Sequence, residues 1–279
     1  MGRDNAKAPG GGSLRPERAA GPPAIGGHDD NAGLFSSLEE LWAVQSANRD
    51  EWYQANRDWW DAGGYGGAND DEAMIGDEGS QDDLAHSARY LAAALERSPR
   101  AKRACAMDGG AGVGRVTKHV LLRWFEKVHL VEGSDALSKH SKRYLGNKRA
   151  QRCSFASQRL EDFSATPGAF GLIWLQWVLQ YLVDADVVAF LRKCAASLDR
   201  GGCLVIKENR PSAATSGKAS RFEFDTPAGP NGRFDITRPD AHHAWLFQQA
   251  GLEVIHSEHF DEVTTWQLEA RRADGPTGR

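Results

Sequence analysis

Met107-Asp108-Gly109-Gly110-Ala111-Gly112-Val113-Gly114-Arg115 is the stretch of sequence that decides the fold of this chain. The apolar run 104–107 before it predicts a short buried strand, and residues 116–125 after it predict a helix. Glycines between a strand and a helix let the backbone turn tightly and approach a ligand without a Cβ in the way. The helix start then offers N–H groups that have no intrahelical partner. The stretch therefore predicts a nucleotide-type cofactor site at the carboxyl end of a parallel strand.

The spacing of the glycines narrows the class of cofactor. They fall as Gly-x-Gly-x-Gly, whereas the dinucleotide fingerprint is Gly-x-Gly-x-x-Gly. A third glycine one residue early is typical of enzymes that use S-adenosylmethionine (SAM). A second predicted strand, 128–132, ends in Glu132, which lies 18 residues after Gly114 (132 − 114). This separation is close to the roughly 20 residues expected for a carboxylate that binds ribose hydroxyls. The alternative is a glycine-rich turn that binds nothing.

Composition bounds the classes of function. The chain has 279 residues with a hydrophobic share of 41% and a charged share of 26%, as in globular proteins. Its net charge of −4 argues against a non-specific nucleic-acid partner. We find neither a membrane span nor a secretory signal, and we expect a monomer in the cytoplasm or nucleus with no membrane partner. The four cysteines, Cys105, Cys153, Cys194 and Cys203, lack paired metal spacing, so we expect reduced thiols and no metal.

We divide the chain into four parts. Residues 1–33 are rich in Gly, Pro, Ala and Arg, and predict a disordered extension, with an organelle transit peptide as the alternative. Residues 34–98 predict a helical lid over a substrate, with helices over 34–61 and 83–95 and Ser37 as an N-cap. Residues 99–272 predict the cofactor-binding domain, and residues 273–279 a tail.

Within the cofactor-binding domain, residues 172–175 form a continuous apolar run, as in a buried parallel strand. Gln176 interrupts this run where ligands of open α/β sheets bind, so we expect the cofactor to be its polar partner. A further strand, 203–209, ends in Asn209. A long loop is predicted over 211–231, and the last helix is predicted to open within 233–240. Strands over 253–259 and 264–271 are predicted to close the sheet as an antiparallel pair.

From about Trp52 to Arg271 the chain resembles the protein α-N-terminal methyltransferases, which methylate an exposed Xaa-Pro-Lys/Arg N-terminus. Four segments carry the resemblance: 108–115, Ile173-Trp-Leu-Gln-Trp177, Phe190-Leu-Arg-Lys-Cys194 and Val205-Ile-Lys-Glu-Asn209. The fold that this resemblance implies is an α/β, seven-stranded, Rossmann-like SAM-dependent methyltransferase sheet with an N-terminal helical lid. It also implies SAM as cofactor and protein N-terminal peptides as substrates.

The resemblance places the family's cofactor contacts on six positions of this chain. Arg115 would pair with the methionine carboxylate of SAM in a charge-assisted contact. Glu132 replaces the family's more usual Asp and keeps an acceptor there. Glu161 stands where an amide is common. The six positions are Gly110, Arg115, Glu132, Leu160, Glu161 and Gln176.

On the substrate side, the resemblance implies that Trp177 packs on the proline ring and that Asn209 binds the peptide backbone. It places Trp60 and Ile75-Gly76 at the mouth of the peptide site. The chain departs from the family in two ways. Tyr181 stands where the family often has a His that helps to take the amine proton. The acidic cluster that holds the substrate's Lys is rearranged, with Asp235 as its best match and Asp225 as the second choice.

Methyl transfer from a sulfonium needs a neutral amine, aligned with the S–CH₃ bond at roughly 3–3.5 Å. An α-amino group has a pKa near ~8, so a modest base suffices. We hypothesise that Asp235 accepts the proton, directly or through water, while Tyr181 orients the amine. Two alternatives stay open: a small-molecule SAM methyltransferase and a non-catalytic binding partner with the same fold. The glycine spacing disfavours an NAD dehydrogenase.

Overall fold

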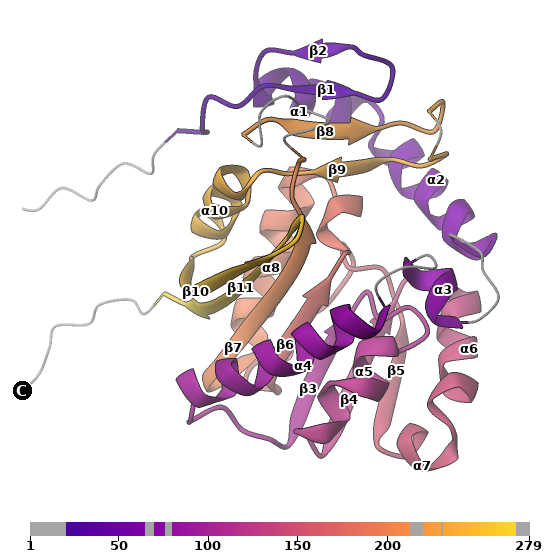
Figure 1. Cartoon of the computed structure of the whole chain (residues 1–279), viewed down its shortest axis with the longest axis vertical. Coiled ribbons are helices and arrows are strands. Elements are labelled where there is room, and N and C mark those ends of the chain that lie inside the picture. The colour runs from indigo at the N-terminus through magenta and orange to yellow at the C-terminus, as the bar shows by residue number, and fades with distance from the viewer. Residues whose placement is uncertain (1–20, 65–69, 76–79, 213–219, 230, 272–279) are drawn as a thin grey trace, which may run out of the picture.

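A computed structural model describes residues 21–64, 70–75, 80–212, 220–229 and 231–271. Across these residues the main sheet has the strand order β10-β11-β7-β6-β3-β4-β5 (Figure 1). Strand β11 runs antiparallel to both of its neighbours, β10 and β7, and the other neighbouring strands pair in the parallel sense. The strands are β3 (Cys105–Gly109), β4 (Lys127–Glu132), β5 (Cys153–Ser157), β6 (Phe170–Gln176), β7 (Leu198–Asn209), β10 (Leu252–Phe260) and β11 (Val263–Ala270). This arrangement confirms the predicted seven-stranded α/β sheet and its closing antiparallel pair.

Strand β6 lies at the centre of the sheet and is buried along its whole length. Its side chains alternate between two apolar cores, as the period of a strand requires. Ile173 and Leu175 pack in the core that includes Phe190 of α8 (Asp184–Ser197). Leu172 and Trp174 pack in the core that includes Leu91 of α4 (Ser80–Arg97). Helices therefore cover both faces of the sheet, which explains why residues 172–175 read as a continuous apolar run.

A second, small sheet has the order β2-β1-β8-β9 (Figure 1). Its strands are β1 (Gly27–Asp29), β2 (Leu34–Phe35), β8 (Phe222–Asp225) and β9 (Asp235–Thr237). Three expectations are wrong here: β1 lies in the predicted disordered extension, β8 in the predicted long loop, and β9 where the last helix was expected to open. The reason is that β1 gains order from backbone bonds to β8 and not from apolar side chains. The Phe222 ring fills the space where a Cβ on Gly27 would lie, so the two strands approach closely.

The predicted helix 34–61 is two helices, α1 (Leu38–Ala47) and α2 (Arg49–Asp61). Asn48 separates them, and its side chain bonds the carbonyl of Val44 at 3.0 Å. Such local bonding competes with helix continuation. Ser37 occupies the predicted N-cap position of α1 but makes no side-chain cap bond. The Trp52 ring of α2 stacks on Phe224 and Phe234, with centroids 5.6 and 4.7 Å away, and so joins this helix to the small sheet.

The remaining elements flank the main sheet. The predicted helix 116–125 is shorter, because α5 (Arg115–His119) gives way to a 3₁₀ turn, η1 (Leu121–Arg123). The others are α3 (Asp70–Ile75), α6 (Asp135–Leu145), α7 (Asn147–Ala150), η2 (Leu179–Tyr181) and α10 (Asp240–Gln249). All four cysteines are free thiols. Among the described helices, none combines the length and the hydropathy that a bilayer crossing requires.

Candidate active site

A cavity of about 310 Å³ lies at the carboxyl ends of β3, β4, β6 and β7, and residues of α2 and α3 also line it. The structure brings eleven of the predicted site residues together on its wall. They are Trp60, Ile75, Gly110, Arg115, Glu132, Leu160, Glu161, Gln176, Trp177, Tyr181 and Asn209. The wall does not include Asp225 or Asp235. Gly76 lies outside the described residues.

The glycine turn forms part of this wall with an exposed backbone. Gly110 and Gly112 have φ angles of 68° and 54°, in the region that disfavours side chains. A Cβ on Gly110 would lie 2.4 Å from Val178 Cγ2, and a Cβ on Gly112 would lie 2.6 Å from Met74 Sδ. Glycine is therefore required twice over, by backbone conformation and by space. The side chains of Val178 and Met74 therefore pack directly on the glycine backbone, and both glycines line the cavity.

Arg115 follows the glycine turn and has one hydrogen-bonding nitrogen to spare. Its Nη2 donates to Asp83 Oδ2 at 2.5 Å, and the side chain is 5% exposed. Its Nη1 is also buried and has no hydrogen-bond partner among the described residues. A buried donor of a guanidinium without an acceptor is costly, so this nitrogen marks a place for an anionic ligand group.

Asp83 of α4 is the hub of the charges under the cavity and is not among the predicted site residues. Besides Arg115, it accepts bonds from Lys207 Nζ and, at 2.9 Å, from Gln176 Nε2. Burial alone would raise the pKa of Asp83, but Lys207 and Arg115 hold it below its ordinary value. The signal for this pair was present in the sequence, because a lysine directly after the apolar run 203–206 of a buried strand needs a buried partner.

Gln176 differs from expectation in its partners. Its amide nitrogen donates to Asp83, and its Oε1 accepts from Trp174 Nε1 at 3.1 Å. The polar group that interrupts the apolar run is therefore already paired within the protein, and its contact with the cofactor stays a prediction. Gln176 still lies on the cavity wall.

Glu132 ends β4 and holds the glycine turn in place. Its Oε2 accepts from the backbone N–H of Gly112 at 2.7 Å, and its Oε1 accepts from that of Ser134 at 2.8 Å. Burial raises the pKa of this carboxyl, while the backbone bonds act against the shift. Ser134 Oγ in turn bonds Asp61, so the end of α2 is fixed beside this acid. Each carboxylate oxygen retains a lone pair for a hydroxyl of a ligand.

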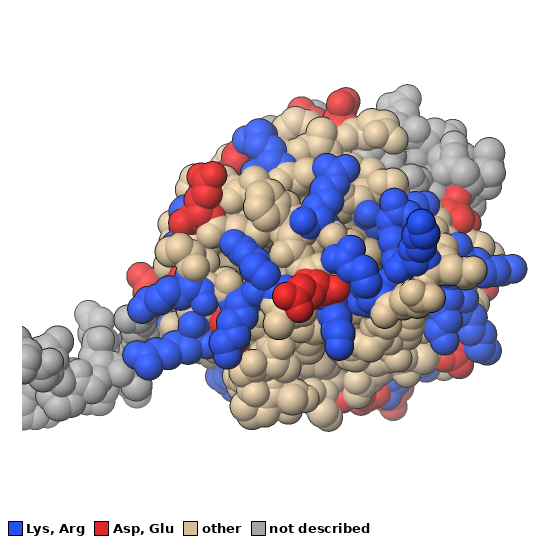
Figure 2. Space-filling view, turned by 90° about the horizontal axis from the view of Figure 1, so that it is seen from below, with Lys and Arg blue, Asp and Glu red and all other residues tan. Residues whose placement is uncertain are grey.

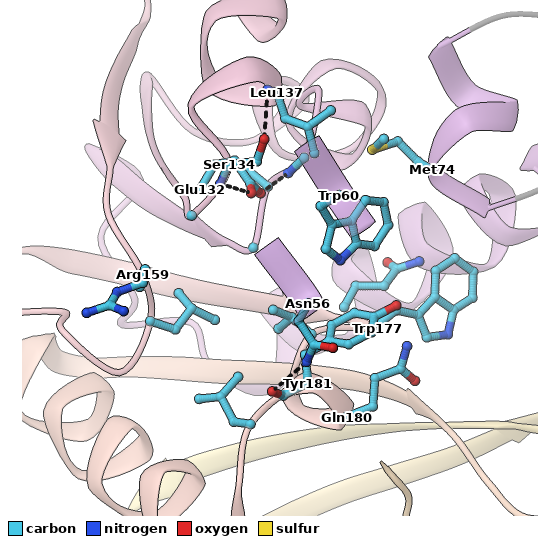
Figure 3. A pocket seen from close by; sticks show the side chains of 18 of the residues that line it. Asn56, Trp60, Met74, Glu132, Ser134, Leu137, Arg159, Trp177, Gln180 and Tyr181 are labelled. Carbon is cyan, nitrogen blue, oxygen red and sulfur yellow. Dashed lines mark hydrogen bonds between the residues drawn. The ribbon is translucent and has the colours of Figure 1, made fainter. Parts of the chain in front are cut away.

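The far side of the cavity is aromatic. Figure 3 shows Trp60, Tyr181 and Trp177 together on one side, with Glu132 and Ser134 on the other. The Trp60 and Tyr181 rings meet edge to face, with centroids 5.8 Å apart. Trp177 has a φ of 53°, which is strained for a bulky residue. Its backbone N–H donates to the carbonyl of Lys207 at 2.9 Å. Such strain is typical of functional positions.

Leu160 and Glu161 form the part of the wall that follows β5. Leu160 is buried and supplies an apolar surface. Burial raises the pKa of Glu161, whose Oε1 lies 3.4 Å from Arg159 Nε. A carboxylate at this position keeps a hydrogen-bond acceptor where the family that the chain resembles commonly has an amide.

The two predicted acids of the substrate side lie outside the cavity wall. Asp225 and Asp235 are cross-strand partners in β8 and β9. Arg233 Nη2 lies 3.2 Å from Asp235 Oδ2, and burial raises the pKa of Asp235 to about 7. The Arg233 guanidinium also lies 5.8 Å from the ring centroid of Tyr181, a wall residue. Asp235 therefore stands one contact behind the cavity.

Similarity to known proteins extends over most of the chain. The model of a family described as "AdoMet dependent proline di-methyltransferase" matches residues 48–266. Among relatives, the Xenopus laevis N-terminal Xaa-Pro-Lys N-methyltransferase 1-A is 37% identical over 191 residues, 67% of this chain and 80% of that protein. The mouse N-terminal Xaa-Pro-Lys N-methyltransferase 1 is 37% identical over 141 residues, 50% of this chain and 63% of the mouse protein. This last match spans less than two thirds of the relative's own length.

Two more distant matches cover more of the chain. The Alpha N-terminal protein methyltransferase 1 of Arabidopsis thaliana is 29% identical over 252 residues, 84% of each chain. The solved structure of a SAM-dependent methyltransferase from Leishmania major aligns with a TM-score of 0.75 at 25% identity, covering 93% of this chain and 100% of that one.

Proposed function

Because this chain belongs to the family of AdoMet-dependent proline di-methyltransferases, we propose that it methylates the α-amino group of protein N-termini of the Xaa-Pro-Lys/Arg type. Its cofactor is SAM, and it is an enzyme of the methyltransferase class. One observation carries the proposal for the substrate. Trp177 and Asn209, the predicted proline and backbone contacts, share a cavity with the glycine turn and with the unpaired Nη1 of Arg115.

The residues present fit the cofactor. Arg115 Nη1 offers a buried donor for the methionine carboxylate, and the glycine turn at Gly110 lines the same cavity. Glu132 would accept from ribose hydroxyls, with Leu160 and Glu161 beside the adenine. When bound, SAM supplies an electrophilic methyl group.

The substrate amine would enter from the aromatic side. The proposal assigns the proline ring to the indole of Trp177 and the peptide backbone to the amide of Asn209, whose Nδ2 is 3.5 Å from Gln180 Oε1. Trp60 and Ile75 would line the mouth. Proline suits such a wall, because its ring is rigid and loses little entropy when an aromatic surface fixes it.

A protonated α-amino group must lose its proton before it can react. In the proposal Asp235 receives it through water, because its carboxylate does not line the cavity, while Tyr181 orients the amine. A carboxyl with a pKa of about 7 is a suitable acceptor for an amine with a pKa near ~8. Asp225 would meet the side chain of the third substrate residue.

The experiment that tests this proposal is mass spectrometry of a Ser-Pro-Lys peptide incubated with the protein and SAM. The proposal predicts added methyl groups on the α-amino nitrogen, and none on a peptide with an acetylated N-terminus. Methylation of small amines or phenols in place of the peptide would reject it. The expected monomer, and the expected location in the cytoplasm or nucleus, remain proposals that sedimentation and cell fractionation test.

A further inference from the structure

The end of the main sheet opposite the cavity is strongly basic. Four segments lie there: 98–104, 120–127 and 146–152 lead into β3, β4 and β5, and 198–202 are the first residues of β7 (Figure 1). We call these four segments the amino-end rim. They contain nine Lys and Arg against two acidic residues, a formal charge of +7, in a chain whose net charge is −4. Figure 2 views this end of the molecule, where Lys and Arg side chains gather.

Most of the basic side chains of the rim are available to a ligand, apart from Arg103, which packs on Phe125, and Arg152, whose guanidinium bonds backbone carbonyls. Eight of the nine are exposed, and none of the nine forms an ion pair with a carboxylate of the described residues. Of the two acids, Asp199 is buried and accepts from the N–H of Lys102 at 3.1 Å, so Glu126 is the exposed one. The nine are Arg100, Lys102, Arg103, Arg123, Lys127, Lys148, Arg149, Arg152 and Arg200.

The rim is an ordered row and not a scatter of charges. The segments lie at the starts of four of the five neighbouring strands β7-β6-β3-β4-β5, so the row spans four strand spacings, roughly 19 Å. Arg152 ties two segments together, because its guanidinium donates to the carbonyls of Leu122 at 3.0 Å, Phe125 at 2.6 Å and Glu126 at 3.0 Å. These bonds fix the backbone of the two segments relative to each other before any ligand arrives.

An exposed aromatic side chain lies within the row. Trp124 is 43% exposed and follows Arg123 directly. A flat ring of this size exposed among cations has the chemistry of a stacking platform for bases, combined with contacts to phosphates. This observation is independent of the charge count, and it identifies the kind of polyanion.

From these observations we propose that the amino-end rim binds single-stranded nucleic acid, with its Arg and Lys on the phosphates and Trp124 stacked on a base. Six of the nine cations are arginines, whose planar fork suits phosphate. A lipid surface fits less well, because interfacial binding needs a broad apolar face, and the other exposed large apolar side chains lie in β2 and β10. The expectation of no nucleic-acid partner rested on the net charge of the whole chain. In the folded chain the positive charges of the rim lie together at one end of the sheet, apart from most of the acidic residues.

Fluorescence anisotropy of a labelled oligouridylate of about 12 nucleotides tests the proposal, with the salt concentration varied. The double variant K148E/R149E should bind at least about tenfold more weakly than wild type. Its log–log salt slope should be shallower by roughly 1.4, since about 0.7 is lost for each phosphate contact to a single strand. The matched control is K139E/R192E, which changes the net charge equally at exposed positions of α6 and α8. The control should keep the wild-type slope.

A second pair of variants tests the stacking. W124A should weaken binding about fivefold to tenfold, and W124F should restore most of it. Thermal melting of every variant checks that the fold is kept. Binding that both double variants weaken equally would overturn the proposal, as would the absence of binding by wild type. Rim-dependent binding of phosphatidylserine vesicles without oligonucleotide binding would overturn it in favour of a membrane.

Discussion

The two ends of one sheet treat charge in opposite ways. At the carboxyl end, the cations Arg115 and Lys207 are buried against Asp83, and only Arg115 Nη1 is left over. At the amino end, eight cations are exposed and form no ion pair with a carboxylate of the described residues. Buried ion pairs hold the Arg115 side chain in one position, which suits a small ligand with a single carboxylate. Exposed charges suit a long polyanion, and their attraction to it weakens as the salt concentration rises. The difference shows how one sheet can offer two kinds of site.

The largest expected effect comes from removing the hub of the buried charges. Asp83→Ala should lower the free energy of unfolding by about 3–5 kcal/mol, because it leaves two buried cations without their carboxylate. Urea denaturation measures this. The neighbouring exposed Asp82→Ala, and Arg123→Ala at the amino-end rim, should each stay within about 0.5 kcal/mol of wild type. Equal effects at Asp83 and Arg123 would remove the distinction between the two ends.

A pH profile tests the proposed proton acceptor. Asp235 accepts a proton only when ionised, and its pKa is raised to about 7, so kcat/KM for a Ser-Pro-Lys peptide should rise as the pH increases through about 7. Asp235→Asn should lower kcat/KM about 100-fold at pH 8 and remove that rise. A profile that keeps its shape in the variant would assign the proton to another group.

Two tryptophans give a matched pair across the sheet. Trp177→Ala should lower kcat/KM for the peptide about 30-fold, since truncating a central aromatic contact costs about 2 kcal/mol of binding. Trp124→Ala at the other end should leave peptide kinetics unchanged within about twofold. Steady-state kinetics on both variants decide this, and a loss at Trp124 as large as that at Trp177 would count against the separation of the sites.

The smallest expected change in stability comes from removing the N-cap of α6, a helix that begins beside the cavity. Ser134 caps α6 by accepting from the N–H of Leu137 at 3.2 Å. Ser134→Ala should therefore lower the free energy of unfolding by about 1 kcal/mol. Arg149→Ala, at an exposed rim position, should stay within about 0.5 kcal/mol. Thermal melting of the two variants compares them, and a stable Ser134→Ala protein would show that the cap is dispensable.

Local sequence patterns predicted the main sheet, and together with the family resemblance they predicted eleven of the residues that line the cavity. The glycine turn, the acid that ends β4 and the apolar run of β6 each mark a carboxyl end of a strand, and such ends meet at one edge. The small sheet escaped prediction, because three-residue strands such as β1 and β9 carry no periodic pattern. Asp83 and Lys207 are 124 residues apart, so their pairing follows from the packing of α4 against the sheet.

Two other features lay beyond local reasoning. The segments of the amino-end rim are scattered between residues 98 and 202, so the net charge of −4 hides their common sign. Only the strand order brings them into one row. The position of Asp235 behind Tyr181 depends on Arg233, which the sequence placed in a helix and the structure places next to a strand.

Calorimetric titration of SAM into two Arg→Gln variants tests the central claim most directly. Arg115→Gln removes the unpaired guanidinium nitrogen of the cavity and should weaken SAM binding by about tenfold to 100-fold, the strength of a hydrogen bond to a charged group. Arg123→Gln removes an exposed cation of the amino-end rim and should bind SAM as wild type does. Equal affinity of the two variants for SAM would contradict the assignment of the cavity as the cofactor site.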